Sequence, residues 1–310
     1  MSLKPRALKP GDTIGIVSPS SPVEQVDLEK GIECITARGY HVVLGPHVLD
    51  RLDTCDYIAG TDENRAADIN AMFADPAIDA IFCARGGYGC LRLLDRIDWQ
   101  VIGRSRKPFV GYSDITSLHL GVAKTSGLPT FHGPMVAAHA RMTDATREQF
   151  WALLESPEPT SIQDSERKPT TLVPGQVEGE LAGGCLCLLA HACGSRYEPN
   201  FDGKIVLIED VGEAVYRADR ALWQLKNAGL LDSAAGFVVG TITGWKKEEA
   251  DPPKNDPVRM FEEILGPLNK PTVLGFPFGH EPDPLLMPLG ARVRLDGTAG
   301  TLELLEGVVE

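Results

Sequence analysis

The chain has 310 residues, of which 43% are hydrophobic and 24% are charged, a composition typical of a folded globular protein. The formal net charge is −13 and no cluster of Lys and Arg stands out, so we expect neither a nucleic-acid partner nor an anionic membrane partner. At roughly 150 residues per domain, the length predicts two domains.

Two further features indicate the compartment. No apolar run reaches the roughly 18 residues of a transmembrane helix, and the first residues lack the apolar stretch of an export signal. The seven cysteines are an odd number and mostly have apolar neighbours, which favours a reduced, cytoplasmic chain. Cys185, Cys187 and Cys193 lie close in sequence, but their spacing matches no standard zinc pattern, so small core residues are the favoured interpretation over a metal site.

The first half alternates short apolar segments with helical ones. A capping box at 21–24 with Pro22 at the first helical position predicts the start of one helix, and Gly39 predicts its end. This alternation is typical of a parallel sheet with helices on its faces. We expect strands at 12–17, 40–44, 80–83 and 108–112, and helices at 22–38, 63–73, 88–96 and 114–124.

The composition changes after residue 155. Pro, Ser, Thr and charged residues dominate 156–175, which predicts a linker between an N-terminal domain, 1–155, and a C-terminal domain, 176–310. In the second domain we expect strands at 204–208 and 236–243, helices at 218–227 and 257–264, and a closing antiparallel pair at 291–295 and 300–305.

The sharpest local signal is the segment from Phe109 to Thr116, in which an apolar strand leads through Gly-Tyr-Ser to a helix. A serine at such a turn can act as a nucleophile, with following N–H groups directed at an oxyanion. Ile115 stands where an α/β-hydrolase elbow needs a small residue, so the segment does not follow that pattern. From these eight residues alone, a helix cap formed by Ser113 or Asp114 is the favoured alternative.

A nucleophilic serine needs a base. His119 lies six residues along the predicted helix and therefore points away from Ser113. His132 follows a predicted strand and His280 lies in a loop rich in Gly and Pro, so each is a candidate base, although a structural role is favoured for either.

Two further segments carry polar groups at the ends of predicted strands. Glu209 and Asp210 end an apolar strand, where they either orient an imidazole or only begin a turn. The glycines after Arg85 fit a dinucleotide loop poorly. They form either a plain tight turn or half of an oxyanion hole, with Arg85 available for a substrate carboxylate or for a structural salt bridge.

Together these segments resemble the LD-carboxypeptidase family, serine peptidases that cleave murein tetrapeptides, and the related microcin-immunity peptidases. The resemblance implies an α/β fold: an N-terminal parallel-sheet domain resembling the class I glutamine amidotransferases, plus a smaller C-terminal α/β domain with mixed strands. It spans nearly the whole chain. The matching stretches are GIVSPSSP at 15–22, ARGGYG at 84–89, GYSDIT at 111–116, FHGP at 131–134, LAGGCL at 181–186, LIEDVGE at 207–213 and GFPFGHE at 275–281.

The resemblance also implies residue roles. Ser113 aligns with the nucleophile, and Glu209 and His280 align with the other two members of a triad that draws on both domains. The oxyanion hole would come from the backbone N–H groups of Asp114 and of Gly86 in the Gly86–Gly87 pair. Arg85 is the candidate for binding the carboxylate of the terminal D-alanine. No metal or other cofactor is implied, and members are commonly cytoplasmic homodimers.

The sequence departs from the family pattern at Cys185 and Cys187, where Asn or Ser is usual. The linker lacks the extra loop expected of the microcin-immunity branch, which favours a murein tetrapeptide as the small peptide substrate and a role in peptidoglycan recycling. The alternatives are a serine hydrolase of peptidyl-nucleotide antibiotics and a non-catalytic ligand-binding protein on the same scaffold.

Overall fold

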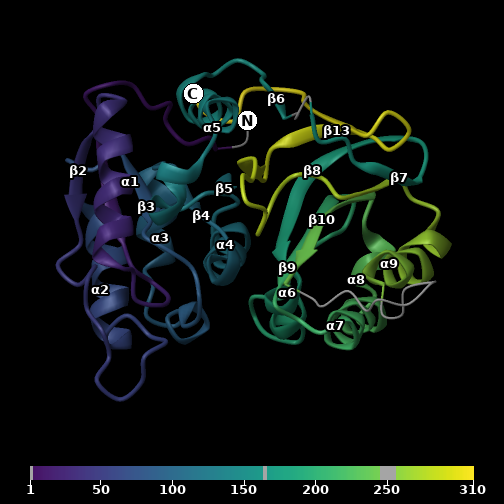
Figure 1. Cartoon of the computed structure of the whole chain (residues 1–310), viewed down its shortest axis with the longest axis horizontal. Coiled ribbons are helices and arrows are strands. Elements are labelled where there is room, and N and C mark those ends of the chain that lie inside the picture. Colours follow the sequence, from purple (N-terminus) through teal and green to yellow (C-terminus); the bar gives the residue numbers. More distant parts are fainter. Residues whose placement is uncertain (1–2, 163–165, 245–255) are drawn as a thin grey trace. The chain divides into compact units, whose positions relative to one another are not determined.

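The structure is a computed structural model that describes residues 3–162, 166–244 and 256–310 (Figure 1). The chain forms two compact units. Unit 1 comprises Met1–Thr160, Leu286–Gly290 and Gly307–Glu310, and unit 2 comprises Ser161–Leu285 and Ala291–Glu306. The chain therefore returns twice to unit 1 after residue 285.

Unit 1 contains a six-stranded sheet in the order β12-β5-β4-β3-β1-β2. The first five strands in sequence are parallel, whereas β12 pairs antiparallel with β5 at the edge. The strands are β1 (Thr13–Val17), β2 (His41–Leu44), β3 (Ala80–Cys83), β4 (Phe109–Gly111), β5 (Thr130–His132) and β12 (Met287–Leu289). The helices are α1 (Gln25–Ala37), α2 (Asp62–Ala74), α3 (Trp99–Ser105), α4 (Thr116–Thr125) and α5 (Asp144–Glu155). The predicted parallel sheet is confirmed.

Two predicted local features of unit 1 are wrong. Glu24, not Ser21, is the N-cap of α1, and the Ser21 hydroxyl donates to the Tyr57 carbonyl instead of capping the helix. The segment 88–96 contains only a 3₁₀ turn, η1 (Cys90–Arg92), because Gly89 adopts a φ of 135°, which is incompatible with a continuous helix. The helix α3 after it was not predicted.

An aromatic cluster packs α5 into unit 1. Trp151 on α5 is buried and stacks on Tyr40 with ring centroids 4.8 Å apart, while Phe150 meets Phe82 of β3 edge-on at 5.7 Å. Tyr40 also donates to the Glu155 carboxylate at 2.7 Å. These aromatic side chains bury apolar area between α5 and β3. Burial of apolar area is the main favourable contribution to the stability of a folded domain.

Unit 2 contains an eight-stranded mixed sheet in the order β6-β14-β13-β8-β9-β10-β11-β7. Parallel pairs β8–β9, β9–β10 and β10–β11 form its centre, and antiparallel pairs flank them. The helices lie beside the central strands (Figure 1). The strands are β6 (Ser161–Ile162), β7 (Thr170–Val173), β8 (Gln176–Cys185), β9 (Ile205–Val211), β10 (Gly236–Thr243), β11 (Thr272–Leu274), β13 (Arg292–Asp296) and β14 (Thr301–Leu304). The helices are α6 (Leu186–Ala192), α7 (Val215–Asn227), α8 (Leu230–Ser233) and α9 (Pro257–Leu265).

The closing antiparallel pair is confirmed as β13 and β14. The segment 156–175, expected to be a linker, contributes the edge strands β6 and β7, and its residues 163–165 lie outside the described residues. The run Thr170–Val173 is β-branched at three of its four positions, which suits an edge strand despite the polar surroundings. The domain limits 1–155 and 176–310 stay predictions.

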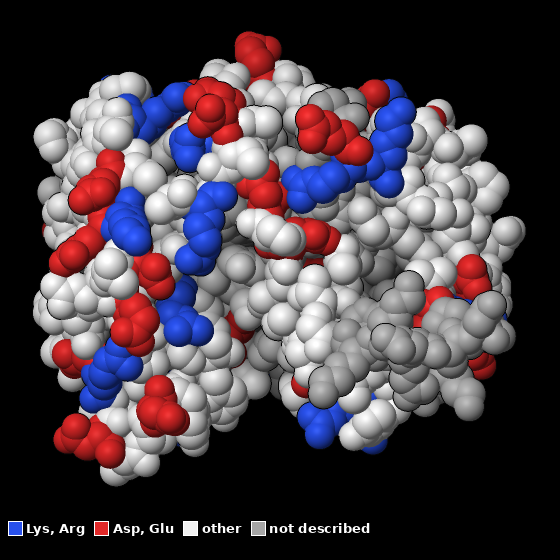
Figure 2. Space-filling model, viewed as in Figure 1, with Lys and Arg blue, Asp and Glu red and all other residues white. Residues whose placement is uncertain are grey.

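The surface carries both signs of charge. On the face shown in Figure 2, Lys and Arg side chains are interspersed with Asp and Glu side chains. Some of the exposed charges form ion pairs, such as that between Arg96 and Glu63, whose Nη2 and Oε1 atoms lie 2.8 Å apart. Within the described residues, no helix is both long and apolar enough to cross a lipid bilayer.

Gly31 on α1 offers a test of helix packing in unit 1. A Cβ atom at this position would lie 2.0 Å from the backbone carbonyl oxygen of Val136, so the helix and the segment after β5 could not keep their present separation. Although Gly→Ala inside a helix usually stabilises, we expect Gly31→Ala to lower the free energy of unfolding by about 1–3 kcal/mol, measured by urea denaturation.

The matched control is Gly266→Ala. Apart from its chain neighbours and the helix backbone, no atom lies within 4 Å of its Cβ position, and the residue has an ordinary φ of −54°. Because Gly266 is helical and precedes Pro267, the added methyl meets only the proline ring, and we expect a loss of no more than about 1 kcal/mol, smaller than in Gly31→Ala. Equal stability of the two variants would contradict the packing argument.

Candidate active site

Ser113 occupies a strained turn at the carboxyl end of β4. Its φ is 64°, in the left-handed region that few residues other than glycine adopt, and a 3₁₀ turn, η2 (Ser113–Ile115), leads directly into α4. Such a conformation costs roughly 1–3 kcal/mol and persists only where the surroundings enforce it. A serine held in this way between a strand and a helix has the geometry of a nucleophile elbow.

Asp114 does not cap the helix, contrary to the alternative favoured from the sequence. Its carboxylate accepts hydrogen bonds from the Ser20 hydroxyl at 2.7 Å and from the Cys90 N–H at 2.8 Å, and no side-chain cap is present at the start of η2 or α4. Burial raises the pKa of Asp114 above its ordinary value, although both donors act in the opposite direction. The side chain therefore ties the elbow to two loops of unit 1.

Gly86 lies directly against the elbow. A Cβ atom on Gly86 would lie 2.9 Å from the Cβ and 3.3 Å from the Oγ of Ser113, so glycine is what permits this close approach. Gly87 has a φ of 123° and would clash with Ser21 if it carried a side chain. The structure thus places Gly86 against the Ser113 turn, while the roles of Gly86 and Asp114 in an oxyanion hole stay predictions.

His119 supports the elbow from inside the unit. Its side chain is buried and its Nε2 lies 2.8 Å from the carbonyl oxygen of Gly111, the last residue of β4. The expectation that His119 serves as a packed residue rather than the base for Ser113 agrees with this contact. Burial lowers the pKa of His119 to about 4, which keeps the imidazole neutral near pH 7.

In unit 2, Glu209 and His280 form a close pair. The His280 Nδ1 lies 2.6 Å from the Glu209 Oε2, and the glutamate side chain is fully buried while that of the histidine is 15% exposed. A carboxylate at this distance fixes the orientation and tautomer of the ring. Of the two candidate bases, His280 therefore has a carboxylate partner, whereas His132 is buried in β5 with its ring 5.8 Å from that of Tyr112.

Two glycines make room for this pair. Gly279 has a φ of 87°, and a Cβ there would lie 2.5 Å from the Glu209 Cγ and Oε2. Gly240 on β10 also lies against Glu209, because a Cβ atom on Gly240 would lie 3.2 Å from the Glu209 Cβ. Neither glycine was predicted to make room for a carboxylate, although Gly279 directly precedes His280 in the sequence.

Arg85 is exposed, and its Nη1 donates to the carbonyl of Pro22 at 3.2 Å. It forms no ion pair with any residue that the structure describes, so a structural salt bridge does not account for it. Its guanidinium retains donors that can bind a carboxylate.

Both halves of the chain match one family of peptidases. Residues 14–133 match the LD-carboxypeptidase N-terminal domain and residues 178–295 match the LD-carboxypeptidase C-terminal domain. The chain belongs to the LD-carboxypeptidase family. Both the family resemblance and the α/β fold class stated from the sequence are confirmed.

Relatives from both branches of the family are similar over nearly their whole length. The chain is 35% identical to the probable murein peptide carboxypeptidase of Bacillus subtilis, covering 100% of this chain and 97% of that protein. The crystal structure of a muramoyltetrapeptide carboxypeptidase from Oxalobacter formigenes is 31% identical, with a TM-score of 0.83 over 96% of this chain and 99% of that one. The microcin C7 self-immunity protein MccF, in complex with aspartyl sulfamoyl adenosine, is 26% identical, with a TM-score of 0.90 over 99% and 100%.

His119 predicts a pH dependence of stability. Its pKa in the folded state, about 4, lies below the ordinary value of 6.5, so unfolding takes up a proton as the pH falls through this window. Its contribution of about 3 kcal/mol is therefore present above pH 6.5 and is lost as the pH falls towards 4. His119→Gln keeps an N–H donor for Gly111, and we expect it to make the free energy of unfolding less dependent on pH between 6.5 and 4, measured by urea denaturation.

The control for this substitution is His191→Gln, because His191 is exposed on α6. We expect the pH dependence of this variant to match that of the unaltered protein. An unchanged pH dependence in His119→Gln would show that His119 is not held neutral by burial.

Proposed function

We propose that the chain is a serine LD-carboxypeptidase that releases the terminal D-alanine from murein tetrapeptides in peptidoglycan recycling. The observation that carries the proposal is the strained backbone of Ser113. A positive φ at a serine costs free energy, and such strain is typical of residues that must present a reactive side chain. The carboxylate-bound His280 and the similarity to murein peptide carboxypeptidases add support.

In this proposal Ser113, His280 and Glu209 form a triad. The Nε2 of His280 takes the proton of Ser113 as its Oγ attacks the peptide carbonyl, and later gives that proton to the leaving D-alanine. Glu209 bonded to Nδ1 keeps Nε2 in the form that accepts a proton and stabilises the imidazolium. Water then hydrolyses the acyl-enzyme.

In the same proposal, unit 1 also provides the oxyanion hole and the group that binds the substrate carboxylate. The backbone N–H groups of Gly86 and Asp114 stabilise the oxyanion, a contribution worth about 3–4 kcal/mol per donor in comparable sites. Arg85 binds the carboxylate of the leaving residue, for which its exposed guanidinium beside the Gly86 loop is suited.

A second function has its own support. The structural similarity to MccF at a TM-score of 0.90 favours an acyl bond to a nucleotide as an alternative target. The same nucleophile and base would serve, and the difference would lie in the leaving group. A peptidyl-nucleotide is therefore the second substrate to be compared with the murein tetrapeptide.

We also infer a cytoplasmic location and a homodimer from the family resemblance. A sedimentation-equilibrium mass equal to a single chain of 33.5 kDa at micromolar concentration would contradict the dimer.

The triad is tested by release of D-alanine from a purified murein tetrapeptide, followed by mass spectrometry. We expect Ser113→Ala to lower kcat by at least about 10⁴-fold, because no nucleophile replaces the hydroxyl. Glu209→Gln should lower kcat by on the order of 10³–10⁴-fold, because an amide can hold the imidazole in the wrong tautomer.

Ser126→Ala is the matched control, since this serine lies at the opposite end of α4. It should retain the activity of the unaltered protein. Release of D-alanine by Ser113→Ala at the normal rate would refute the proposed nucleophile. Cleavage of a peptidyl-nucleotide but not of the tetrapeptide would support the second function.

Arg85 is tested with two substrates, the tetrapeptide and its C-terminal amide. We expect Arg85→Ala to raise KM for the free acid about 10- to 100-fold, the value of one charge-assisted hydrogen bond, and to change KM for the amide little. Arg96→Ala, which removes an exposed arginine paired with Glu63, is the control. Equal losses on acid and amide would contradict carboxylate binding by Arg85.

A further inference from the structure

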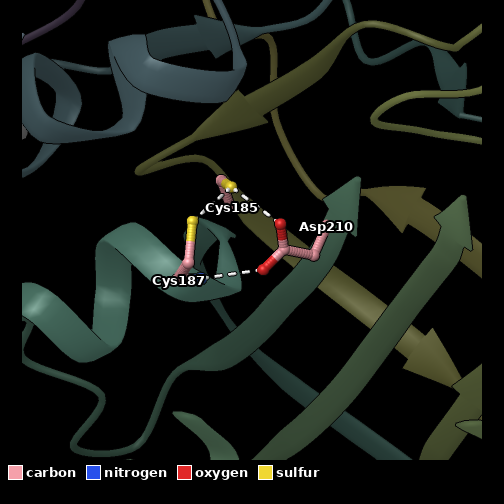
Figure 3. A group of neighbouring side chains, drawn as sticks. All are labelled: Cys185, Cys187 and Asp210. Atoms are coloured by element: carbon pink, nitrogen blue, oxygen red, sulfur yellow. Dashed lines mark hydrogen bonds between the residues drawn. The ribbon is translucent and has the colours of Figure 1, made fainter. Parts of the chain in front are cut away.

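A second polar cluster lies on the opposite face of β9 from Glu209. Successive strand residues point to opposite faces, so Glu209 meets His280 while Asp210 meets Cys185 and Cys187 (Figure 3). The Sγ atoms of Cys185 and Cys187 lie 3.5 Å apart, and the Cys185 Sγ lies 3.5 Å from the Asp210 Oδ1. The ligand atoms of the three residues all lie within 4.8 Å of one another.

These separations approach those of a tetrahedral metal centre. With Zn–S bonds of about 2.3 Å and a Zn–O bond of about 2.0 Å, tetrahedral angles place two sulfur ligands about 3.8 Å apart and a sulfur and an oxygen about 3.5 Å apart. The two distances at Cys185 therefore need to change by only a few tenths of an ångström. The Cys187 Sγ and the Asp210 carboxylate oxygen lie within 4.8 Å of each other and must approach by up to about 1.3 Å to bind the same ion.

The backbone holds this arrangement in place. Cys185 ends β8, which pairs parallel with β9, and Cys187 lies two residues on, in the first turn of α6. The Asp210 carboxylate accepts hydrogen bonds from the Val211 N–H at 2.8 Å on Oδ1 and from the Cys187 N–H at 3.0 Å on Oδ2. Both bonds orient the carboxylate without using the thiols, so they can persist when a metal ion binds.

The chemistry of the three side chains selects the kind of ion. Thiolate ligands prefer zinc, cadmium and copper(I), whereas magnesium and calcium prefer all-oxygen sites. Cys185 and Asp210 are buried, at 3% and 1% exposure, and Cys187 is partly exposed and gives the ion access from solvent. None of the seven cysteines forms a disulfide, so both thiols are present in the reduced chain.

We propose that Cys185, Cys187 and Asp210 bind a thiophilic divalent cation of the zinc class, with a water molecule as the fourth ligand. Binding replaces the contacts between the two thiols and the carboxylate with two metal–sulfur bonds and one metal–oxygen bond, and it releases both thiol protons to solvent. No oxidation or reduction occurs. Glu209, the neighbour of Asp210 on β9, is bonded to His280 and is not one of the three ligands, although its charge acts on the Cys185 thiol.

The test is a titration of the whole chain with Co²⁺, kept reduced by a phosphine that does not itself supply thiols. Tetrahedral thiolate coordination gives a sulfur-to-cobalt charge-transfer band in the near ultraviolet, which a structural role of these residues cannot produce. We expect the band to saturate at one cobalt ion per chain and to disappear when Zn²⁺ is added. Affinity should fall as the pH is lowered, because protons compete for the thiolates.

Three variants locate the ligands. Cys185→Ser and Cys187→Ser should each remove the charge-transfer intensity of one sulfur and weaken binding on the order of 100-fold. Asp210→Asn should keep the band and weaken binding by about tenfold, because an amide oxygen is a poorer ligand. Cys193→Ser is the control, since Cys193 ends α6 outside the cluster, and it should bind cobalt as the unaltered chain does.

Four results would overturn the proposal. The first is the lack of a charge-transfer band in the unaltered chain at millimolar Co²⁺. The second is an unchanged band and affinity in Cys187→Ser with its circular dichroism intact. The third is equal loss in Cys193→Ser, which would place the metal elsewhere. The fourth is a Cys185–Cys187 disulfide that resists the phosphine, seen as a mass lower by two hydrogen atoms.

Discussion

The strained backbone at Ser113 is the constraint on which the rest of unit 1 depends. A φ of 64° at a serine must be enforced by neighbours, and three of them are identifiable. The Asp114 carboxylate ties the turn to Ser20 and Cys90, the glycine at 86 lets its loop pack against the serine, and His119 binds the carbonyl of the last residue of β4. Asp114, Gly86 and His119 thus together hold the backbone that presents the Ser113 hydroxyl.

In unit 2, strand β9 positions the polar groups, because it places two adjacent carboxylates on opposite faces. Glu209 is fully buried and bound to His280, while Asp210 is bound to backbone N–H groups and to a pair of cysteines. A buried carboxylate is costly unless each oxygen has donors, and burial does raise the pKa of Asp210. In our proposals, two neighbouring residues of one strand therefore serve different chemistry: Glu209 orients the imidazole of His280, and Asp210 binds a metal ion.

Much of this could be predicted from the sequence, and the failures have physical causes. The strands β3 and β10 are short, apolar and bounded by turn residues, so their limits were predictable, and the order of motifs indicated the family. The segment 88–96 has helical composition, but Gly89 at a φ of 135° prevents a helix. Asp114 resembles a helix cap in sequence, yet its partners Ser20 and Cys90 are distant in the chain. The Cys185–Asp210 contact also could not be predicted, because it depends on the parallel pairing of β8 and β9.

In the proposed reaction, Ser113 forms a covalent acyl-enzyme. The most direct measurement is peptide mapping by mass spectrometry after rapid acid quenching of the protein mixed with a murein tetrapeptide. We expect a tripeptidyl ester on the peptide that contains Ser113, and loss of that adduct in Ser113→Ala. Release of D-alanine without any adduct on Ser113, or an adduct on another residue, would contradict it.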